Sequence, residues 1–269
     1  MRLISFDAFR TLDINGVVYV KPEHMFLEQS LLKEADWLLF PQYWQVNSLL
    51  YGLNVKIFPS PASYYLGHNK IEMTRWLEFI APDHVPVTFI LANTATHQAQ
   101  ILEQFDYPFV AKEIKSSRGD GVHLITCPSE FSEYCRKVDI LYVQEYLPID
   151  RDLRLVVIGQ RVVGGYWRLQ SKNGFHNNIA QGGELMFGPL PVDAVNLVEK
   201  LARYAGLNHA GFDVAVVDGC FYILEFNRLF GNQGLRELGI NTGSIIYDYL
   251  LSQTAFYADP TTLIDRDIG

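Results

Sequence analysis

Three oxygen-bearing side chains stand near the end of the chain, in two segments rich in strand-forming residues. Asp213 lies in the first segment, and Glu225 and Asn227 lie in the second. Carboxylates among Phe, Val, Ile and Leu are costly to bury unless a positive group meets them. Because Mg²⁺ prefers one or two carboxylates together with phosphate oxygens, the pattern predicts a magnesium site that carries a phosphate ligand. The alternative is a hairpin in which Asp213 lies at a strand end and Glu225 pairs with a nearby arginine.

The turn between these two segments decides whether the three side chains share a face. An Asp-Gly pair at 218–219 is a strong hairpin signal. Glu225 and Asn227 are two residues apart on one strand and therefore point the same way. A two-residue loop would place Asp213 and Glu225 on opposite faces, because a slip of one residue reverses every side chain. We therefore predict a three-residue loop over 217–219, with its glycine left-handed as a bulge.

A lysine inside an apolar strand precedes a segment rich in serine and glycine. Glycine backbone N–H groups can approach a phosphate closely, and a neighbouring lysine adds a point charge. The P-loop pattern is absent, so this would be a different kind of phosphate site. The alternative is a plain hairpin with a surface lysine. The candidate phosphate-binding residues are Lys112, Ser116, Ser117, Gly119 and Gly121.

Two further segments carry candidate ligand-binding groups. The strand that ends at 145–147 could dock a purine, with its backbone reading the adenine edge and the Glu145 carboxylate accepting from the amino group; an exposed glutamate at a strand end is the alternative. Arg154 and Arg168 lie on the two strands of the next hairpin. A guanidinium on a rigid strand can clamp a carboxylate or a transferring phosphoryl group, or it can form a structural salt bridge.

Composition narrows the class of protein. The chain has 269 residues, a net charge of −8, 49% hydrophobic and 19% charged residues, which is ordinary for a soluble enzyme of two or three subdomains. The negative charge argues against nucleic acid as a partner. Three cysteines without a CxxC pair predict reduced thiols and a cytoplasmic location. We expect no signal peptide and no membrane span, since no long apolar stretch occurs.

The hydrophobic pattern also predicts the elements that position these groups. We expect a small α/β unit over residues 1–67, with strands at 37–40 and 55–58 and a helix at 43–53. Farther along the chain we expect a helix at 62–80, a strand at 85–90, and helices at 96–104, 194–205 and 245–252.

The order of these signals resembles the ATP-grasp superfamily, and most closely its RimK-like branch of carboxylate–amine ligases. The resemblance covers roughly residues 56–250. It implies an α+β and α/β fold in which two α+β subdomains hold ATP between their sheets, after a short Rossmann-like N-terminal domain. The implied limits are 1–67 for the N-terminal domain, 68–255 for the ATP-grasp domain with its lid at about 82–145 and its metal and catalytic subdomain at about 146–255, and 256–269 for a tail.

The resemblance also implies roles for individual residues. In addition to the lid residues 116–121, it implies phosphate contacts for Lys70 and Lys112, adenine contacts for Glu145, Tyr146 and Leu147, a ribose-side role for Asp152 and a nucleotide contact for Arg154. It implies that Arg168 and Asn178 act near the γ-phosphate and an acyl-phosphate. It implies that Asp213, Glu225 and Asn227 bind Mg²⁺, with Mn²⁺ as a substitute. The chain departs from the family at Arg228-Leu229-Phe230-Gly231, where Ser-x-Pro-Gly is usual. That departure bears on acceptor recognition.

The implied activity is ATP-dependent formation of an amide or peptide bond through an acyl-phosphate. The implied substrates are a small carboxylate and an amine, such as an amino acid or a peptide, with no nucleic acid or membrane partner and with assembly as a homo-oligomer. Two alternatives remain at this point: a kinase on the same scaffold that phosphorylates a hydroxyl, and an ATP-binding regulatory module without turnover.

Overall fold

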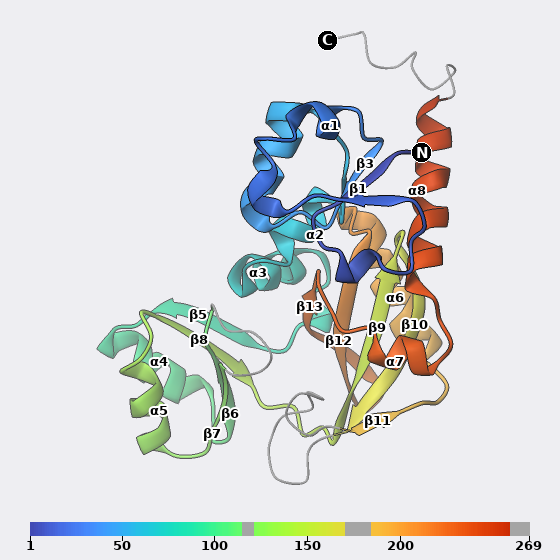
Figure 1. Cartoon of the computed structure of the whole chain (residues 1–269). Coiled ribbons are helices and arrows are strands. Elements are labelled where there is room, and N and C mark those ends of the chain that lie inside the picture. The colour runs from blue at the N-terminus through green and yellow to red at the C-terminus, as the bar shows by residue number, and fades with distance from the viewer. Residues whose placement is uncertain (115–120, 170–183, 259–269) are drawn as a thin grey trace, which may run out of the picture.

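Three β-sheets organise the chain in the computed structural model (Figure 1), which describes residues 1–114, 121–169 and 184–258. The first sheet is parallel and has the order β2-β1-β3-β4. Its strands are β1 (Leu3–Ser5), β2 (Val17–Tyr19), β3 (Trp37–Leu39) and β4 (Ile57–Phe58). Strands β1, β3 and β4 are buried throughout, as expected for a parallel sheet covered on both faces.

Short helical segments surround this N-terminal sheet. They are the 3₁₀ turns η1 (Phe9–Thr11), η2 (Pro22–His24) and η3 (Tyr43–Gln45), the π-helix η4 (Ser48–Leu53), and the α-helices α1 (Gln29–Lys33) and α2 (Pro61–Leu66). The predicted single helix at 43–53 is therefore wrong in detail. Reciprocal capping between Gln42 and Gln45 makes a separate tight turn, and a left-handed Asn54 with φ of 54° ends η4.

The predicted continuous helix at 62–80 is broken in the middle. Helix α2 ends at Leu66, with Gly67 as its C-cap. Helix α3 (Lys70–Ile80) begins after Asn69, whose side-chain oxygen accepts a hydrogen bond from the Ile71 N–H at 2.9 Å. Lys70 is therefore the first residue of a second helix. This break turns α3 toward the large sheet, where Met73 packs against the backbone of Phe226.

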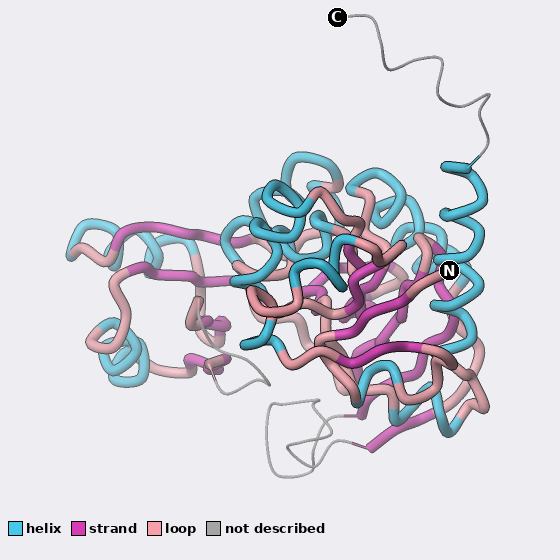
Figure 2. Tube along the Cα trace, turned by 45° about the horizontal axis from the view of Figure 1, so that its top comes forward, coloured by secondary structure: helices cyan, strands magenta, loops and turns pink. Residues whose placement is uncertain are grey.

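A second, antiparallel sheet forms a lobe set apart from the rest of the molecule (Figures 1 and 2). We call it the lid sheet; its order is β5-β8-β6-β7. Its strands are β5 (Thr88–Ala92), β6 (Phe109–Lys112), β7 (Val122–Ile125) and β8 (Ile140–Glu145), and the lobe's helices are α4 (Ala95–Gln104) and α5 (Pro128–Cys135); the short turn η5 (Pro82–His84) leads into it. An aromatic core that includes Phe109 and Phe131 joins sheet and helices.

The third sheet, the catalytic sheet, is antiparallel with the order β11-β10-β9-β12-β13. Its strands are β9 (Arg151–Ile158), β10 (Arg161–Leu169), β11 (Glu184–Met186), β12 (His209–Val217) and β13 (Cys220–Asn227), and the accompanying helices are α6 (Val192–Ala205), α7 (Gln233–Glu237) and α8 (Thr242–Ala258). Helices α3 and α6 cover one face. Helices α7 and α8 and the N-terminal sheet pack on the other. Helix α8 is longer than the predicted 245–252 segment at both ends.

The β12–β13 hairpin corrects the predicted loop. Val217 pairs with Cys220, so the loop has two residues, and both Asp218 (φ 50°) and Gly219 (φ 82°) are left-handed, as in a type I′ turn. The register shifts farther along, where Leu224 is the extra residue of a bulge. Asp213 therefore lies directly opposite Glu225. The prediction of a three-residue loop was wrong, and the bulge lies inside the strand instead.

Candidate functional site

A buried network of two arginines and two aspartates lies on the face of the catalytic sheet that is turned toward the N-terminal unit. Arg154 Nε lies 2.5 Å from Asp213 Oδ1, and Arg154 Nη2 donates to Oδ2 at 3.1 Å. Arg168 holds Asp152 with two hydrogen bonds of 2.7 and 2.6 Å and also reaches Asp213 Oδ1 at 3.0 Å. All four residues are buried. The network fixes both guanidiniums rigidly beside Asp213.

A second group of charged side chains lies at the end of β13. The Asn227 amide donates to Glu225 Oε1 at 3.0 Å. Lys112, at the end of β6 in the lid sheet, is buried and places its ammonium 5.7 Å from the centre of the Tyr142 ring. Lys70 comes from the first turn of α3. Three elements that are distant in sequence thus place their polar side chains around one strand end.

The pKa shifts show that these groups share one electrostatic environment. Burial acts to raise the pKa of Glu225, but Lys70, Lys112 and the Asn227 amide together hold it below its ordinary value. Burial lowers the pKa of Lys112 to about 8, with Lys70 adding to the effect and Glu225 opposing it. Burial raises the pKa of Asp213, while Arg154 and Arg168 act in the opposite direction.

The described side chains of this site carry a net positive charge. Four are cationic and three are carboxylates, which leaves one positive charge in excess: Lys70, Lys112, Arg154 and Arg168 against Asp152, Asp213 and Glu225. A partly buried surplus of positive charge suits a polyanion such as a nucleotide phosphate.

The donor set also fits a hard cation. Glu225 faces the site with a carboxylate, and Asn227 uses its amide N–H on Glu225, which leaves its carbonyl oxygen to a ligand. Asp213 lies across from Glu225 on the paired strand; its Oδ1 contacts both guanidiniums and its Oδ2 contacts one, which leaves a lone pair on Oδ2 for a cation. Two carboxylates and one amide oxygen are ligands that Mg²⁺ accepts. Within the described ranges no three His, Cys, Asp or Glu side chains gather, so no site rich in nitrogen or sulfur ligands competes with this one there.

The adenine-side residues are only partly free for a ligand. Glu145 ends β8, and its Oε1 accepts from the Val87 N–H at 2.7 Å, while its own N–H donates to the Val87 carbonyl. Leu147 follows in the connecting loop and accepts from the Ile149 N–H at 2.9 Å. Tyr146 lies between them. One Glu145 oxygen is therefore committed to the protein, and recognition of an amino group would fall to the other oxygen or to the backbone.

Asp152 differs most from its expected surroundings. Both of its oxygens bond Arg168 inside the protein, which favours a role in positioning Arg168 over contact with a ribose.

Of the predicted lid residues, Gly121 is described: its carbonyl accepts from the Glu113 N–H at 2.7 Å at the base of the lid hairpin. The predicted Ser116, Ser117, Gly119 and Asn178 lie outside the described residues.

One neighbour of Lys112, Tyr142, was not predicted. The Tyr142 ring lies against the Lys112 ammonium, and its hydroxyl bonds the Thr74 hydroxyl at 2.6 Å, which ties the lid sheet to α3. In β8, Leu141 and Val143 pack into the aromatic core of the lid lobe, so Tyr142 lies on the opposite face; this position does not by itself predict a contact with a lysine on another strand.

The low pKa of Lys112 gives a testable pH dependence. Because the pKa of Lys112 is about 8, its ammonium is charged at lower pH and attracts phosphate. At higher pH the free enzyme must take up a proton to bind ATP equally well. We expect the Kd for ATP to rise above about pH 8 with a limiting slope of about tenfold per pH unit. Lys112→Met should weaken binding by about ten- to a hundredfold and abolish the slope.

Isothermal titration with ATP across this pH range checks the expectation. Lys137→Met is a matched control, because Lys137 is an exposed lysine of the same lobe, paired with Glu133 at 2.7 Å. An affinity unchanged by Lys112→Met would remove Lys112 from the phosphate site.

Comparison with known proteins gives a consistent result. A family model of the RimK-like ATP-grasp domain matches residues 73–250. The chain is 29% identical over 242 residues to a probable alpha-L-glutamate ligase of Haemophilus ducreyi, an alignment that covers 84% of this chain and 78% of that protein. It is 28% identical over 157 residues to N-acetylaspartylglutamate synthase A of Homo sapiens, covering 56% of this chain and 40% of that protein. The chain therefore spans less than half of this human relative.

Solved structures share the fold. A RimK-domain ATP-grasp protein from Sphaerobacter thermophilus superposes with a TM-score of 0.73 at 17% identity, over 93% of this chain and 100% of the other. The D-alanine–D-alanine ligase of Bacillus anthracis complexed with ATP gives 0.70 at 15% identity, over 96% and 99% of the two chains. In the part of the chain that the structure describes, no helix is long and apolar enough to cross a membrane.

Proposed function

Because the chain belongs to the RimK-like ATP-grasp family, we propose that it is an ATP-dependent ligase that joins a carboxylate to an amine. The observation that carries the proposal is the placement of Glu225 and Asn227, opposite Asp213, with Lys70 and Lys112 beside them. This is a phosphate-binding and cation-binding arrangement between the catalytic sheet and the lid sheet. An amino acid or a peptide is the substrate class we propose, since the relatives are named as glutamate and alanine ligases.

In the proposed reaction, an oxygen of the substrate carboxylate attacks the γ-phosphorus of ATP. The bond to the β–γ bridging oxygen breaks, and ADP leaves. The amine then attacks the acyl carbon, phosphate departs, and the amine loses a proton as the amide forms. Each step needs positioning and charge stabilisation more than covalent chemistry from the protein.

The proposed roles follow from where each side chain is held. Lys70 and Lys112 bind phosphate oxygens, and Arg168, fixed by Asp152, stabilises charge on the phosphoryl group in transfer. Arg154 keeps Asp213 in place. Mg²⁺, held by Asp213, Glu225 and Asn227, would neutralise phosphate charge when bound. The roles of Ser116, Ser117, Gly119 and Asn178, the contacts of Tyr146 and Leu147, and the domain limits near 67, 145 and 255 stay predictions.

The test is ADP release from Mg·ATP with pooled amino acids, dipeptides and small carboxylic acids, followed by mass spectrometry. A product with the mass of acid plus amine minus water supports a ligase and identifies both substrates. A phosphorylated hydroxyl compound would instead favour the kinase. ATP binding without ADP release from any pool would contradict the proposed activity on small molecules.

A further inference from the structure

Lys112 ends β6 with its side chain buried, and only 7% of the residue is exposed. Among the described residues, the ion pairs of the lid lobe do not include it. A buried ammonium is destabilising unless another group interacts with it. The Tyr142 ring is such a group, since its centre lies 5.7 Å from the Lys112 Nζ and a ring face attracts a cation at this range.

Lys112 and Tyr142 lie on the same face of the lid sheet. Ala111 precedes Lys112 and packs in the aromatic core of the lobe, as do Leu141 and Val143 on either side of Tyr142. Successive side chains of a strand point to opposite faces, so both Lys112 and Tyr142 point away from that core. Because β6 and β8 are paired, the ring and the ammonium meet across two neighbouring strands.

A second tyrosine holds the backbone of both residues from the core side. The register of β6 and β8 pairs Ala111 with Val143 and goes no farther. Beyond this point the Tyr134 hydroxyl donates to the Lys112 carbonyl at 3.0 Å and accepts from the Tyr142 N–H at 3.0 Å. Tyr134 comes from α5 and is buried. One buried hydroxyl therefore joins the two strands where their direct pairing ends, and it fixes Lys112 and Tyr142 relative to each other.

Tyr142 also connects this pair to α3. Its hydroxyl lies 2.6 Å from the Thr74 hydroxyl, and both side chains are buried. Thr74 comes four residues after Lys70, the first residue of α3, so the two side chains lie on one face of the helix, a turn apart. Burial raises the pKa of Tyr142 to about 12, so the hydroxyl keeps its proton near pH 7. Strands β6 and β8 and helix α3 thus meet at one tyrosine.

We propose that Tyr142 is a positioning residue of the phosphate site, whose ring places the Lys112 ammonium and whose hydroxyl sets the lid sheet against the face of α3 that begins with Lys70. The inference rests on the proposed function, in which both lysines bind phosphate oxygens of ATP. A lysine has a long flexible side chain, and one that is already held before ATP arrives loses less conformational entropy on binding. Tyr142 therefore acts on ATP affinity through Lys112.

A double-mutant cycle, measured by isothermal titration of the full chain with ATP, tests this role. Tyr142→Leu removes both the ring and the hydroxyl and should weaken ATP binding by about ten- to thirtyfold. With Lys112→Met already in place, the same substitution should weaken binding by no more than about threefold, because the lysine through which it acts is gone. A tyrosine with a merely structural role would weaken ATP binding by the same factor in both backgrounds.

Two milder variants test the hydroxyl. Tyr142→Phe retains the ring beside Lys112 but loses the hydrogen bond to Thr74, and Thr74→Val loses the same bond from the other side. Each should weaken ATP binding by about two- to tenfold. The two together should weaken it no more than either one alone, since they remove one interaction. Circular dichroism checks the fold of each variant, and the cycle with Lys112→Met is run on Tyr142→Phe if Tyr142→Leu does not fold.

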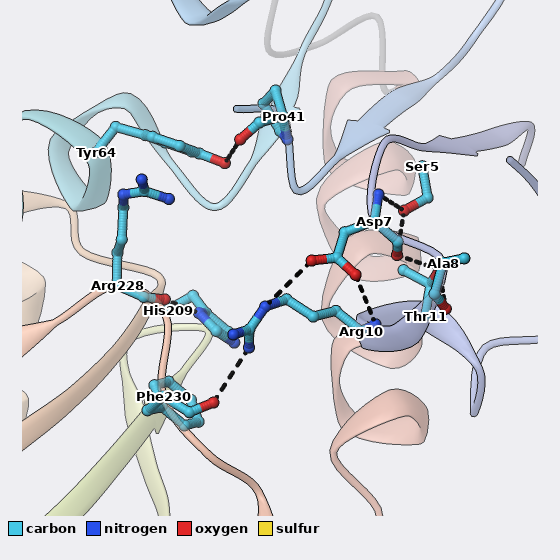
Figure 3. Close-up of polar contacts among 10 residues, drawn as sticks. All are labelled: Ser5, Asp7, Ala8, Arg10, Thr11, Pro41, Tyr64, His209, Arg228 and Phe230. Carbon is cyan, nitrogen blue, oxygen red and sulfur yellow. Dashed lines mark hydrogen bonds and ion pairs between the residues drawn. The ribbon is translucent and has the colours of Figure 1, made fainter. Parts of the chain in front are cut away.

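Tyr64→Leu is the matched control, because Tyr64 is another buried tyrosine that contacts a cation. The guanidinium carbon of Arg228 lies 4.5 Å from the centre of its ring, and its hydroxyl donates to the Pro41 carbonyl at 2.5 Å (Figure 3). Tyr64 belongs to α2 and not to the lid lobe. Its replacement should therefore change ATP affinity by the same factor with and without Lys112.

Equal weakening by Tyr142→Leu in the two backgrounds, or unchanged ATP affinity in Tyr142→Leu, overturns the positioning role and leaves Lys112 in the phosphate site. Unchanged affinity in both Tyr142→Phe and Thr74→Val overturns the part assigned to the hydroxyl. An affinity that Lys112→Met does not alter would contradict the phosphate role of Lys112 and this inference with it. Coupling between Tyr142 and Lys112 in a protein that ligates no substrate would contradict the proposed ligase function alone.

Discussion

Replacing Glu225 with Gln is expected to lower kcat by about a thousandfold, because a metal-bound phosphoryl group depends on several kcal/mol of charge stabilisation. Glu225 lies between Lys70, Lys112 and the Asn227 amide and is held in its charged form by them. The glutamine has the same shape and can still accept from Asn227, so the fold should persist. Steady-state ADP release measures the effect, and circular dichroism checks the fold.

The control for this variant is Glu133→Gln, which changes an exposed carboxylate of the lid lobe that pairs with Lys137. It should leave kcat unchanged. Binding of Mn²⁺ in the presence of ADP, followed by electron paramagnetic resonance, provides a readout apart from turnover and should weaken in Glu225→Gln. Full activity together with unaltered Mn²⁺ binding would remove Glu225 from the cation site.

The types of residue at the site could be predicted from the sequence because buried carboxylates and lysines are rare and need partners. The face shared by Glu225 and Asn227 follows directly from the two-residue period of a strand. The strands of the lid sheet and the catalytic sheet follow from runs of strand-forming residues, and in the catalytic sheet glycine-containing turns separate two pairs of these runs. The ATP-grasp fold expected from the order of these signals is confirmed by the family match and the structural neighbours.

Register could not be predicted, and the two hairpins show why. Both have two-residue loops with left-handed residues, at Gly159-Gln160 and Asp218-Gly219. Each loop alone would place the charged side chains on opposite faces. Each hairpin then contains one extra residue, Val163 in β10 and Leu224 in β13, which restores the shared face. Side-chain packing selects such bulges. Gly164 and Gly165, which follow Val163 inside the strand, are a weak local signal for the first bulge, and no such residue stands beside Leu224.

The same limit applies to the arginines. The sequence allowed two interpretations of Arg168: a structural salt bridge or a clamp near the phosphoryl group. Each requires a charged partner, and only the strand pairing shows that this partner is Asp152, which lies opposite Arg168. The hydrogen bond from Arg10 to the Phe230 carbonyl depends on how the N-terminal unit packs on the catalytic sheet (Figure 3). That packing joins residues more than 200 positions apart, which no periodic pattern can reveal.

Asp152→Ala should destabilise the protein by about 3–5 kcal/mol, because it removes one partner from a buried ion pair and leaves Arg168 with less compensation. Asp152 makes two hydrogen bonds to Arg168, and both side chains are 6% exposed. Arg168 keeps its contact with Asp213 at 3.0 Å, so the loss should lie within this range and not above it. Equilibrium unfolding in urea, followed by the fluorescence of Trp167 and the other tryptophans, measures the change.

A double variant separates the free-energy cost of leaving Arg168 unpaired from the net contribution of the Asp152–Arg168 pair to stability. Asp152→Leu combined with Arg168→Met replaces the buried ions with apolar groups, and it should recover much of the stability while remaining inactive in ligation. Glu133→Ala, which breaks the exposed pair with Lys137, should change stability little. If Asp152→Ala proved no more destabilising than Glu133→Ala, the network would not be holding Arg168 in place. Its position would then have to come from the packing of β10 alone.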